Sequence, residues 1–249
     1  MILDILKEKA LKSAKKNNLE LEGFHIGELF TYALIKDQKN KFIGVTLTPK
    51  NEGELTKESF NTIDEILTSK NYNPTSRAII LATINAIGQY ELQNQDMILK
   101  NSLREELYKL IVNNSQKDNK IVFIGNLKPV VKQLREESRD VTVFCRSKVE
   151  PANKVYNDIF EYEAVSSADI VIITGASLIG STIDALLKFT QKAKMVVISG
   201  FSVGLNPIWL KNLGITHVAS LYLENCPQKE IEKDDLETIF KNRCYIQKI

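Results

Sequence analysis

The sequence is poor in the residues that usually build metal centres. It holds three cysteines and two histidines among 249 residues. Cys145, Cys226 and Cys244 lie far apart and form no Cys-x-x-Cys pair. Neither a zinc ribbon nor a disulfide framework is therefore expected.

Long hydrophobic runs and an excess charge are also missing. No segment approaches the roughly 18 consecutive apolar residues of a membrane span, and the amphipathic N-terminal pattern lacks the apolar core of a signal peptide. Lys and Arg number 33 against 31 Asp and Glu, interspersed along the chain. This balance argues against a nucleic-acid or membrane partner. With 43% hydrophobic residues, we expect a globular, soluble, cytoplasmic protein.

Several catalytic signatures are absent as well. There is no His-Glu-x-x-His, no Gly-x-Ser-x-Gly and no Walker loop, so hydrolase and kinase functions have no direct support. Gly125 stands alone where a dinucleotide fingerprint would need three glycines. Arg146 ends the next predicted strand and could meet a 2′-phosphate, but a tight turn and a solvated arginine are the favoured interpretation.

The first half reads as α+β. Apolar spacing predicts a helix over residues 2–17, and extended structure over 21–35 forms a hairpin with a strand over 42–47. Three further helices are predicted, at 58–69, 76–89 and 101–112. The second of them is apolar on most faces, so we expect it to be buried. A polar linker over 113–119 predicts two domains, 1–115 and 116–249.

The second half alternates short apolar runs with helical segments. Strands are predicted at 120–124, 141–144, 170–173, 195–198 and 216–219, with helices at 129–135, 183–189 and 207–213 and a closing helix at 231–242. This alternation is typical of a parallel sheet covered on both faces. The expected fold class is α/β, a Rossmann-like domain of about five strands preceded by a smaller α+β domain.

The most informative stretch runs from Thr174 to Thr182, between an apolar strand and an amphipathic segment. Loops that open a helix leave N–H groups free for anions, and open parallel sheets bind ligands at the carboxyl ends of their strands. A second Gly/Ser loop, 199–204, follows the next strand. Each loop alone is equally well explained as ordinary turn chemistry, but together they favour a site. The predicted ligand-binding residues are Gly125, Thr174, Gly175, Ser177, Thr182, Gly200 and Ser202.

Two residues of the first half complete the predicted site. Asn85 interrupts the apolar helix and must satisfy its amide, either on a neighbouring backbone or in a cleft. Arg77 is a cleft cation or half of a surface salt bridge. Glu224 and Cys226 are weak candidates for a soft or borderline metal, because their spacing is not diagnostic. No catalytic residue is predicted, and the cofactor is left open, with a metal ion or metal chelate as the candidate.

Three segments together carry a family resemblance: SRAIILATINAIG, SADIVIITGASLIGSTIDALL and VVISGFSVGLNPIWLKNLGITHVAS. With IGELFTYALIKDQKNKFIGVTLTP near the N-terminus, the chain resembles the uncharacterised heavy-metal chelation family over most of its length. The resemblance implies an enolase-N-terminal-like domain joined to a Rossmann-like domain, with a site in the cleft between them. It assigns Asn85 and the loops after Thr174 and Gly200 to that site. Gly180 replaces the family's asparagine, which implies an altered ligand.

Three functions are therefore considered. The first is a protein that binds a small anionic ligand or metal chelate and handles metal. The second is an enzyme with a nucleotide-like cofactor, and the third an interaction module with a degenerated site. No motif decides whether the protein is an enzyme, and a homo-oligomer is compatible with the sequence.

Overall fold

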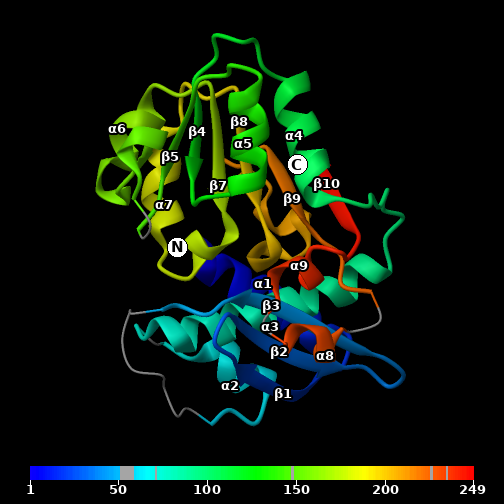
Figure 1. Ribbon diagram of the computed structural model, residues 1–249. Coiled ribbons are helices and arrows are strands. Elements are labelled where there is room, and N and C mark those ends of the chain that lie inside the picture. Colours follow the sequence, from blue (N-terminus) through cyan, green and yellow to red (C-terminus); the bar gives the residue numbers. More distant parts are fainter. Residues whose placement is uncertain (51–58, 71, 147–148, 225–226, 234) are drawn as a thin grey trace.

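Two separate sheets divide the molecule into two lobes (Figure 1). The computed structural model describes residues 1–50, 59–70, 72–146, 149–224, 227–233 and 235–249. The small lobe has a three-stranded antiparallel sheet, and the large lobe has a seven-stranded, mostly parallel sheet. The expected α/β fold class is confirmed.

The small sheet is formed by β1 (Glu20–Ile26), β2 (Phe30–Lys36) and β3 (Lys41–Leu47), in that order. The extended segment expected over 21–35 is two strands, because the chain turns where the Gly27 N–H donates to the Phe30 carbonyl at 2.8 Å. The expected hairpin is β2–β3, whose turn is held by Asp37 accepting from the N–H groups of Lys39 and Asn40. β3 is an edge strand, so one side of its backbone has no strand partner.

Helix α3 (Pro74–Gln93) packs on one face of the small sheet, and helices α1 (Ile2–Lys16) and α2 (Ile63–Thr68) pack against α3 and against each other. Helix α3 begins where Asn73 accepts from the N–H groups of Thr75 and Ser76, with Pro74 at the first helical position. Fifteen of its twenty residues are buried, as its apolar composition predicts. Across the part of the chain that the structure describes, no helix is long and apolar enough to cross a membrane.

The large sheet has the strand order β10-β9-β8-β7-β4-β5-β6. Its strands are β4 (Ile121–Ile124), β5 (Val141–Phe144), β6 (Val155–Tyr156), β7 (Ile170–Thr174), β8 (Met195–Ser199), β9 (His217–Leu221) and β10 (Cys244–Lys248). Only β10 runs antiparallel to its neighbour. The two outermost strands were not predicted from the sequence, because β6 is only two residues long and β10 follows a predicted helix.

Helices cover both faces of the large sheet. Helices α4 (Leu103–Asn113) and α5 (Lys128–Glu136) share one hydrophobic core with one face, and α6 (Glu161–Ser166), α7 (Thr182–Leu186), α1 and α3 share a second core with the other. Short 3-10 turns complete this lobe: η1 (Pro151–Asn153), η2 (Asp158–Phe160), η3 (Gly175–Leu178), η4 (Leu187–Phe189), η5 (Phe201–Val203) and η6 (Pro207–Leu210).

The strand order by itself predicts where a ligand crevice would lie, without reference to side chains. Starting from β4, one series of strands runs outward through β5 and β6, and the other through β7, β8 and β9. The order therefore reverses between β4 and β7. Open α/β sheets bind ligands at the carboxyl ends of the strands beside such a switch point.

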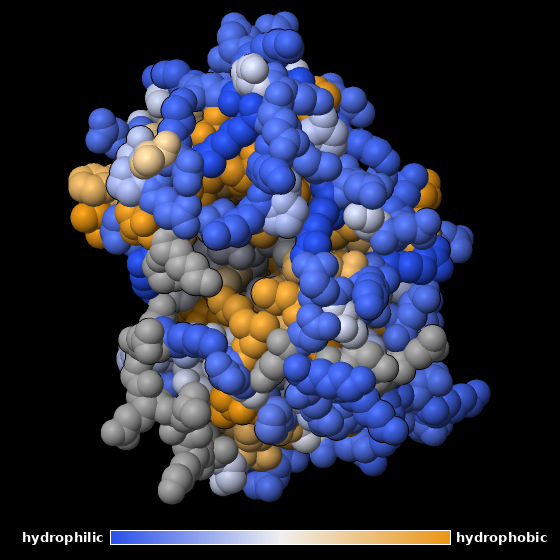
Figure 2. Space-filling view, in the orientation of Figure 1, coloured by the Kyte–Doolittle hydropathy of each residue, from blue (hydrophilic) through white to orange (hydrophobic). Residues whose placement is uncertain are grey.

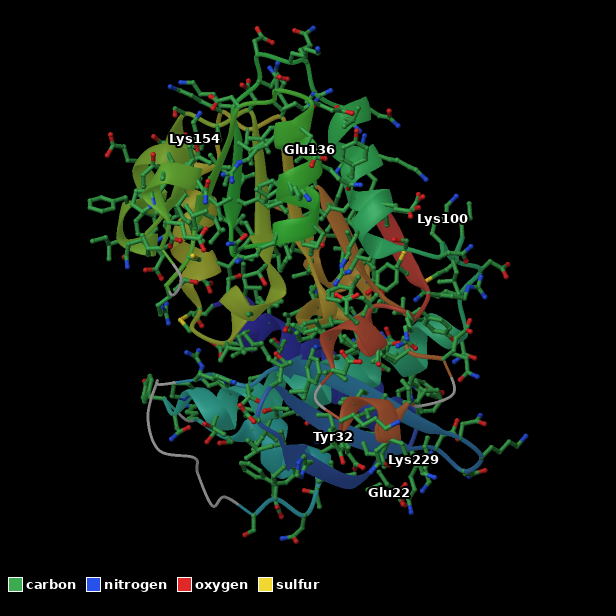
Figure 3. All side chains as sticks on the ribbon, in the orientation of Figure 1. Glu22, Tyr32, Lys100, Glu136, Lys154 and Lys229 are labelled. Atoms are coloured by element: carbon green, nitrogen blue, oxygen red, sulfur yellow. The ribbon has the colours of Figure 1, made fainter. Side chains whose placement is uncertain are left out.

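The C-terminal segment returns from the large lobe to the small one (Figure 1). The closing helix expected over 231–242 is two short helices, α8 (Gln228–Ile231) and α9 (Leu236–Ile239), because Asp235 begins a new helix by accepting from the Glu237 N–H. Tyr32 of β2, labelled in Figure 3, accepts from Gln228 of α8 at 3.1 Å, and its hydroxyl donates to Glu232 at 2.6 Å. The small sheet is thus enclosed by α3 on one face and by this segment on the other.

The contact of β3 with α3 gives a stability prediction. A Cβ on Gly44 would lie 2.1 Å from the Ala82 carbonyl oxygen and 2.1 Å from the Ala86 nitrogen. Gly44→Ala should lower the free energy of unfolding by about 2–3 kcal/mol, because the backbones must separate. Gly23→Ala, with nothing within 4 Å of the added atom, is the matched control in denaturant melts. Equal stability of the two variants would contradict the close approach.

Candidate functional site

A recess lies between the two lobes, at the level where β4 and β7 end (Figure 2). Hydrophobic side chains line its lower side, toward the small lobe. The recess thus coincides with the switch point of the large sheet. The candidate residues are described by their position relative to this switch point.

Gly125 and Thr174 meet at the switch point. Gly125 follows β4 with φ of +99°, and a Cβ there would lie 2.7 Å from Thr174 Cγ2. Its N–H donates to the Phe144 carbonyl at 2.7 Å. Only glycine fits this position without strain, so the lone glycine of the first crossover has a structural reason apart from any cofactor.

The Thr174–Thr182 loop does not lead directly into a long helix. It forms η3, passes through Ser181 with a left-handed φ of 55°, and enters the five-residue α7. The Ser177 hydroxyl donates to the Thr174 carbonyl at 2.8 Å, and Thr182 Oγ1 donates to the Ser177 carbonyl at 3.4 Å. These two hydroxyls therefore hold the loop itself.

The two predicted rim loops are adjacent. A Cβ on Gly175 would lie 2.8 Å from the backbone of Ser202 and Val203, so η3 and η5 touch through backbone atoms. Gly200 begins the second loop with φ of +110°. Its carbonyl accepts from the buried Ser220 hydroxyl at 2.8 Å.

Asn85 and Ser202 both bind the free edge of β3. The Asn85 side-chain amide donates to the Val45 carbonyl at 2.9 Å, and the Ser202 hydroxyl accepts from the Leu47 N–H at 3.0 Å. An edge strand needs such partners for its unpaired backbone groups. Ser202 of the large lobe thus joins the two lobes, while Asn85 fixes α3 to β3. Asn85 Oδ1 remains buried without a partner among the described residues.

The other predicted residues differ in their relation to these loops, and only Arg77 contacts one of them, the Thr174–Thr182 loop, through Ser181. Arg77 donates to the Ser181 hydroxyl at 2.7 Å, beside α7. Glu224 forms an exposed ion pair with Arg243 at 3.0 Å. Cys226 lies outside the described residues. Over the chain as described, no three His, Cys, Asp or Glu side chains are placed to hold a metal ion.

Sequence reasoning missed Ser199, the last residue of β8. It pairs in register with Thr174, so both side chains project from the same face of the sheet. Its hydroxyl is buried, with 1% of the residue exposed, and has no partner among the described residues. The alternation of Val197 and Ser199 on one face could have revealed it, but the predicted strand stopped at 198.

A buried carboxyl group lies at the other side of the switch point, near the end of β5. Glu161 begins α6 and is 4% exposed. Burial raises its pKa to about 7, the neighbouring Asp158 adds to the rise, and Arg146 opposes it. Arg146 also pairs with Asp158 at 3.0 Å, so the arginine considered for a 2′-phosphate is engaged by an acid.

A second hollow, of about 520 Å³, lies in the small lobe between α1, β1 and α2. Its rim includes Lys15 and Asp64, which form an exposed ion pair at 2.8 Å. Thr62 on the rim caps α2. These three polar side chains thus have structural partners, and the hollow lies away from the switch point.

Comparisons with known proteins support the resemblance found in the sequence. A family model described as "Putative heavy-metal chelation" matches residues 109–229. These residues include β4 to β9 and every loop at the carboxyl edge. The resemblance to this family is confirmed.

Relatives and solved structures extend the likeness over the remaining chain. An uncharacterised protein of Methanocaldococcus jannaschii is 29% identical over 229 residues, which cover 88% of this chain and 86% of the relative. A crystal structure from Pyrococcus horikoshii, a protein of unknown function from the same family, matches with a TM-score of 0.84 and 25% identity over all of both chains. A family structure from Desulfitobacterium hafniense shares the fold, with a TM-score of 0.76 and 17% identity over 98% of each chain.

The raised pKa of Glu161 predicts a pH-dependent stability. The folded pKa of about 7 exceeds the ordinary 4.5, so the folded state binds the Glu161 proton more tightly than the unfolded state does. The stabilisation from this bound proton is fully present below pH 4.5 and is lost as the pH rises through 7. Glu161→Gln should therefore be more stable than the wild type at pH 8 by about 1–3 kcal/mol, with the difference vanishing near pH 4. Urea melts across this range measure it. The exposed Glu163→Gln on the same helix is the control, and identical pH profiles of wild type and Glu161→Gln would contradict the assignment.

Proposed function

We propose that this chain, which resembles the heavy-metal chelation family, binds a small anionic ligand or a metal chelate in the recess between its lobes. We further propose that this binding serves a metal-handling role. The observation that supports this most directly is the position of the recess at the switch point, beside Gly125 and Thr174.

The walls of the recess suit a ligand of mixed character. The large lobe contributes the backbone of η3 and η5 and the half-buried Thr174 side chain. The lower side of the recess is hydrophobic. A small organic molecule with anionic groups at one end matches both surfaces, because ligand pockets combine apolar walls with a few fixed polar groups.

A chelate fits these residues better than a bare ion. A metal ion bound directly needs several donor side chains at fixed distances, and the described residues contain no cluster of three. A chelate already contains the donor atoms that bind its metal ion, so the protein needs to supply only hydrogen bonds and a complementary shape. The proposal therefore does not depend on Glu224 or Cys226.

A nucleotide-like cofactor is the second candidate, and one observation favours it. Helix α5 starts at the switch point, and its N-cap residue Leu127 has no side chain that accepts from its first turn. Such a helix start suits a phosphate group. Thermal-shift screens with nicotinamide, flavin and adenosyl cofactors, run beside metal chelates, separate the two candidates, because a bound ligand raises the melting temperature.

Removal of one hydroxyl at the switch point tests the proposed function. Thr174→Val keeps the shape of the side chain but removes its hydrogen-bonding group, so affinity for the ligand should fall about tenfold. Calorimetric titration with the citrate complexes of zinc, nickel and cobalt measures the loss. Thr142→Val, in strand β5 two strands away and similarly half-buried, should bind like the wild type. Failure of the wild type to bind any of the three chelates would overturn the metal-chelate assignment.

A further inference from the structure

We infer that the recess contains an oxyanion subsite, formed by the hydroxyls of Thr174 and Ser199 and by the first turn of α5. The subsite would take a phosphate or carboxylate group. This inference rests on the proposed function for the location of the ligand, and it adds which group of the ligand is held and by which atoms.

The strand register brings the components of the subsite to one face. Ile124 pairs with Phe144 and with Ile173, and Thr174 pairs with Ser199. The next residues of β4 and β5, Gly125 and Cys145, therefore continue the line of Thr174 and Ser199 across the carboxyl edge. Val130 and Val131 of α5 belong to the same hydrophobic core as Phe123 and Val197 on this face. The two hydroxyls thus project from the face that α5 covers.

Ser199 is the observation that points to a missing partner. Its hydroxyl is buried and meets no donor or acceptor among the described residues. Burial of an unpaired hydroxyl costs free energy that a hydrogen-bonding partner recovers, and native proteins pair nearly all such groups. Ser220, one strand away and equally buried, shows the usual arrangement by donating to the Gly200 carbonyl.

The start of α5 supplies further donors. The N–H groups of Val130 and Val131 both turn back to the Leu127 carbonyl. Pro129 has no N–H, and the N–H groups of Leu127 and Lys128 meet no acceptor within the described part of the chain. The positive end of a nine-residue helix dipole adds to their attraction for an anion.

The chemistry of the subsite selects an oxyanion. Two hydroxyls and two backbone N–H groups all donate hydrogen bonds, and no carboxylate belongs to the group. The Lys128 side chain at the start of the helix pairs with Glu150 at 3.9 Å, so its charge is not counted in the subsite. A negatively charged group with several acceptor oxygens satisfies this arrangement.

Titration with simple anions tests the subsite without any metal. We expect inorganic phosphate or citrate to shift the backbone amide resonances of Leu127 and Lys128 in a saturable way. A response to phosphate alone identifies a phosphoryl group, and a response to citrate alone identifies a carboxylate. Ser199→Ala should weaken the binding about tenfold, while raising the melting temperature of the anion-free protein by removing an unpaired buried hydroxyl.

The opposite signs of these two effects separate a binding role from a structural one. Ser13→Ala, which removes a buried hydroxyl that donates to Glu91, should lower the melting temperature and leave anion binding unchanged. Unmoved amides in the wild type, or equal anion affinity of wild type and Ser199→Ala, would overturn the subsite. If anions shift these amides but no metal citrate binds, the subsite stands and the metal-chelate function fails. If metal citrate binds without moving them, the function stands and the subsite fails.

Discussion

Helix α3 is buried on nearly every side, and two amide side chains on it bind the backbone of both lobes. Asn85 donates to β3 of the small sheet. Gln89 donates to the carbonyls of Gly204 and Leu221 and accepts from the Leu223 N–H, all in the large lobe. Loss of one partner would leave buried polar groups unpaired, at a cost of about 1–3 kcal/mol each. The helix therefore fixes the distance between the lobes, and with it the width of the recess.

Two glycines allow this arrangement. Gly44 lets β3 pack against the middle of α3. Gly88 lets α3 pack against the backbone of Leu205, because a Cβ at position 88 would lie only 2.4 Å from the Leu205 Cα atom. Side chains at these positions would push the lobes apart. Asn85 and Ser202 thus act as supports, because both bind the backbone of β3. This explains why the fold requires an asparagine in an apolar helix.

The sequence predicted what depends on local pattern. Burial of α3, the alternation of strands and helices, and the contact between the loops after Thr174 and Ser199 all follow from apolar spacing and from the geometry of parallel sheets. The partners of individual polar groups could not be predicted, because they depend on distant backbone. Asn85 reaches Val45 and Ser202 reaches Leu47, separations that no local pattern encodes.

Short elements were the second limit. Strand β6 has two residues, and the helix expected over 231–242 gives way to two four-residue helices, α8 and α9. Apolar periodicity carries little information over so few residues. The conformation of the loop after Thr174 was not predicted for a related reason, since its small residues suit both a 3-10 turn and the start of a longer helix.

The return of the C-terminal segment to the small sheet has a consequence for the order of assembly. Phe30 and Tyr32 are made early during synthesis, yet they are covered by Phe201 and by the segment that carries Glu232. The small sheet is therefore completed only after a segment 200 residues later in the chain has been made. Until that segment emerges, the face of the sheet that carries Phe30 and Tyr32 lacks its cover, and the nascent chain carries an apolar surface.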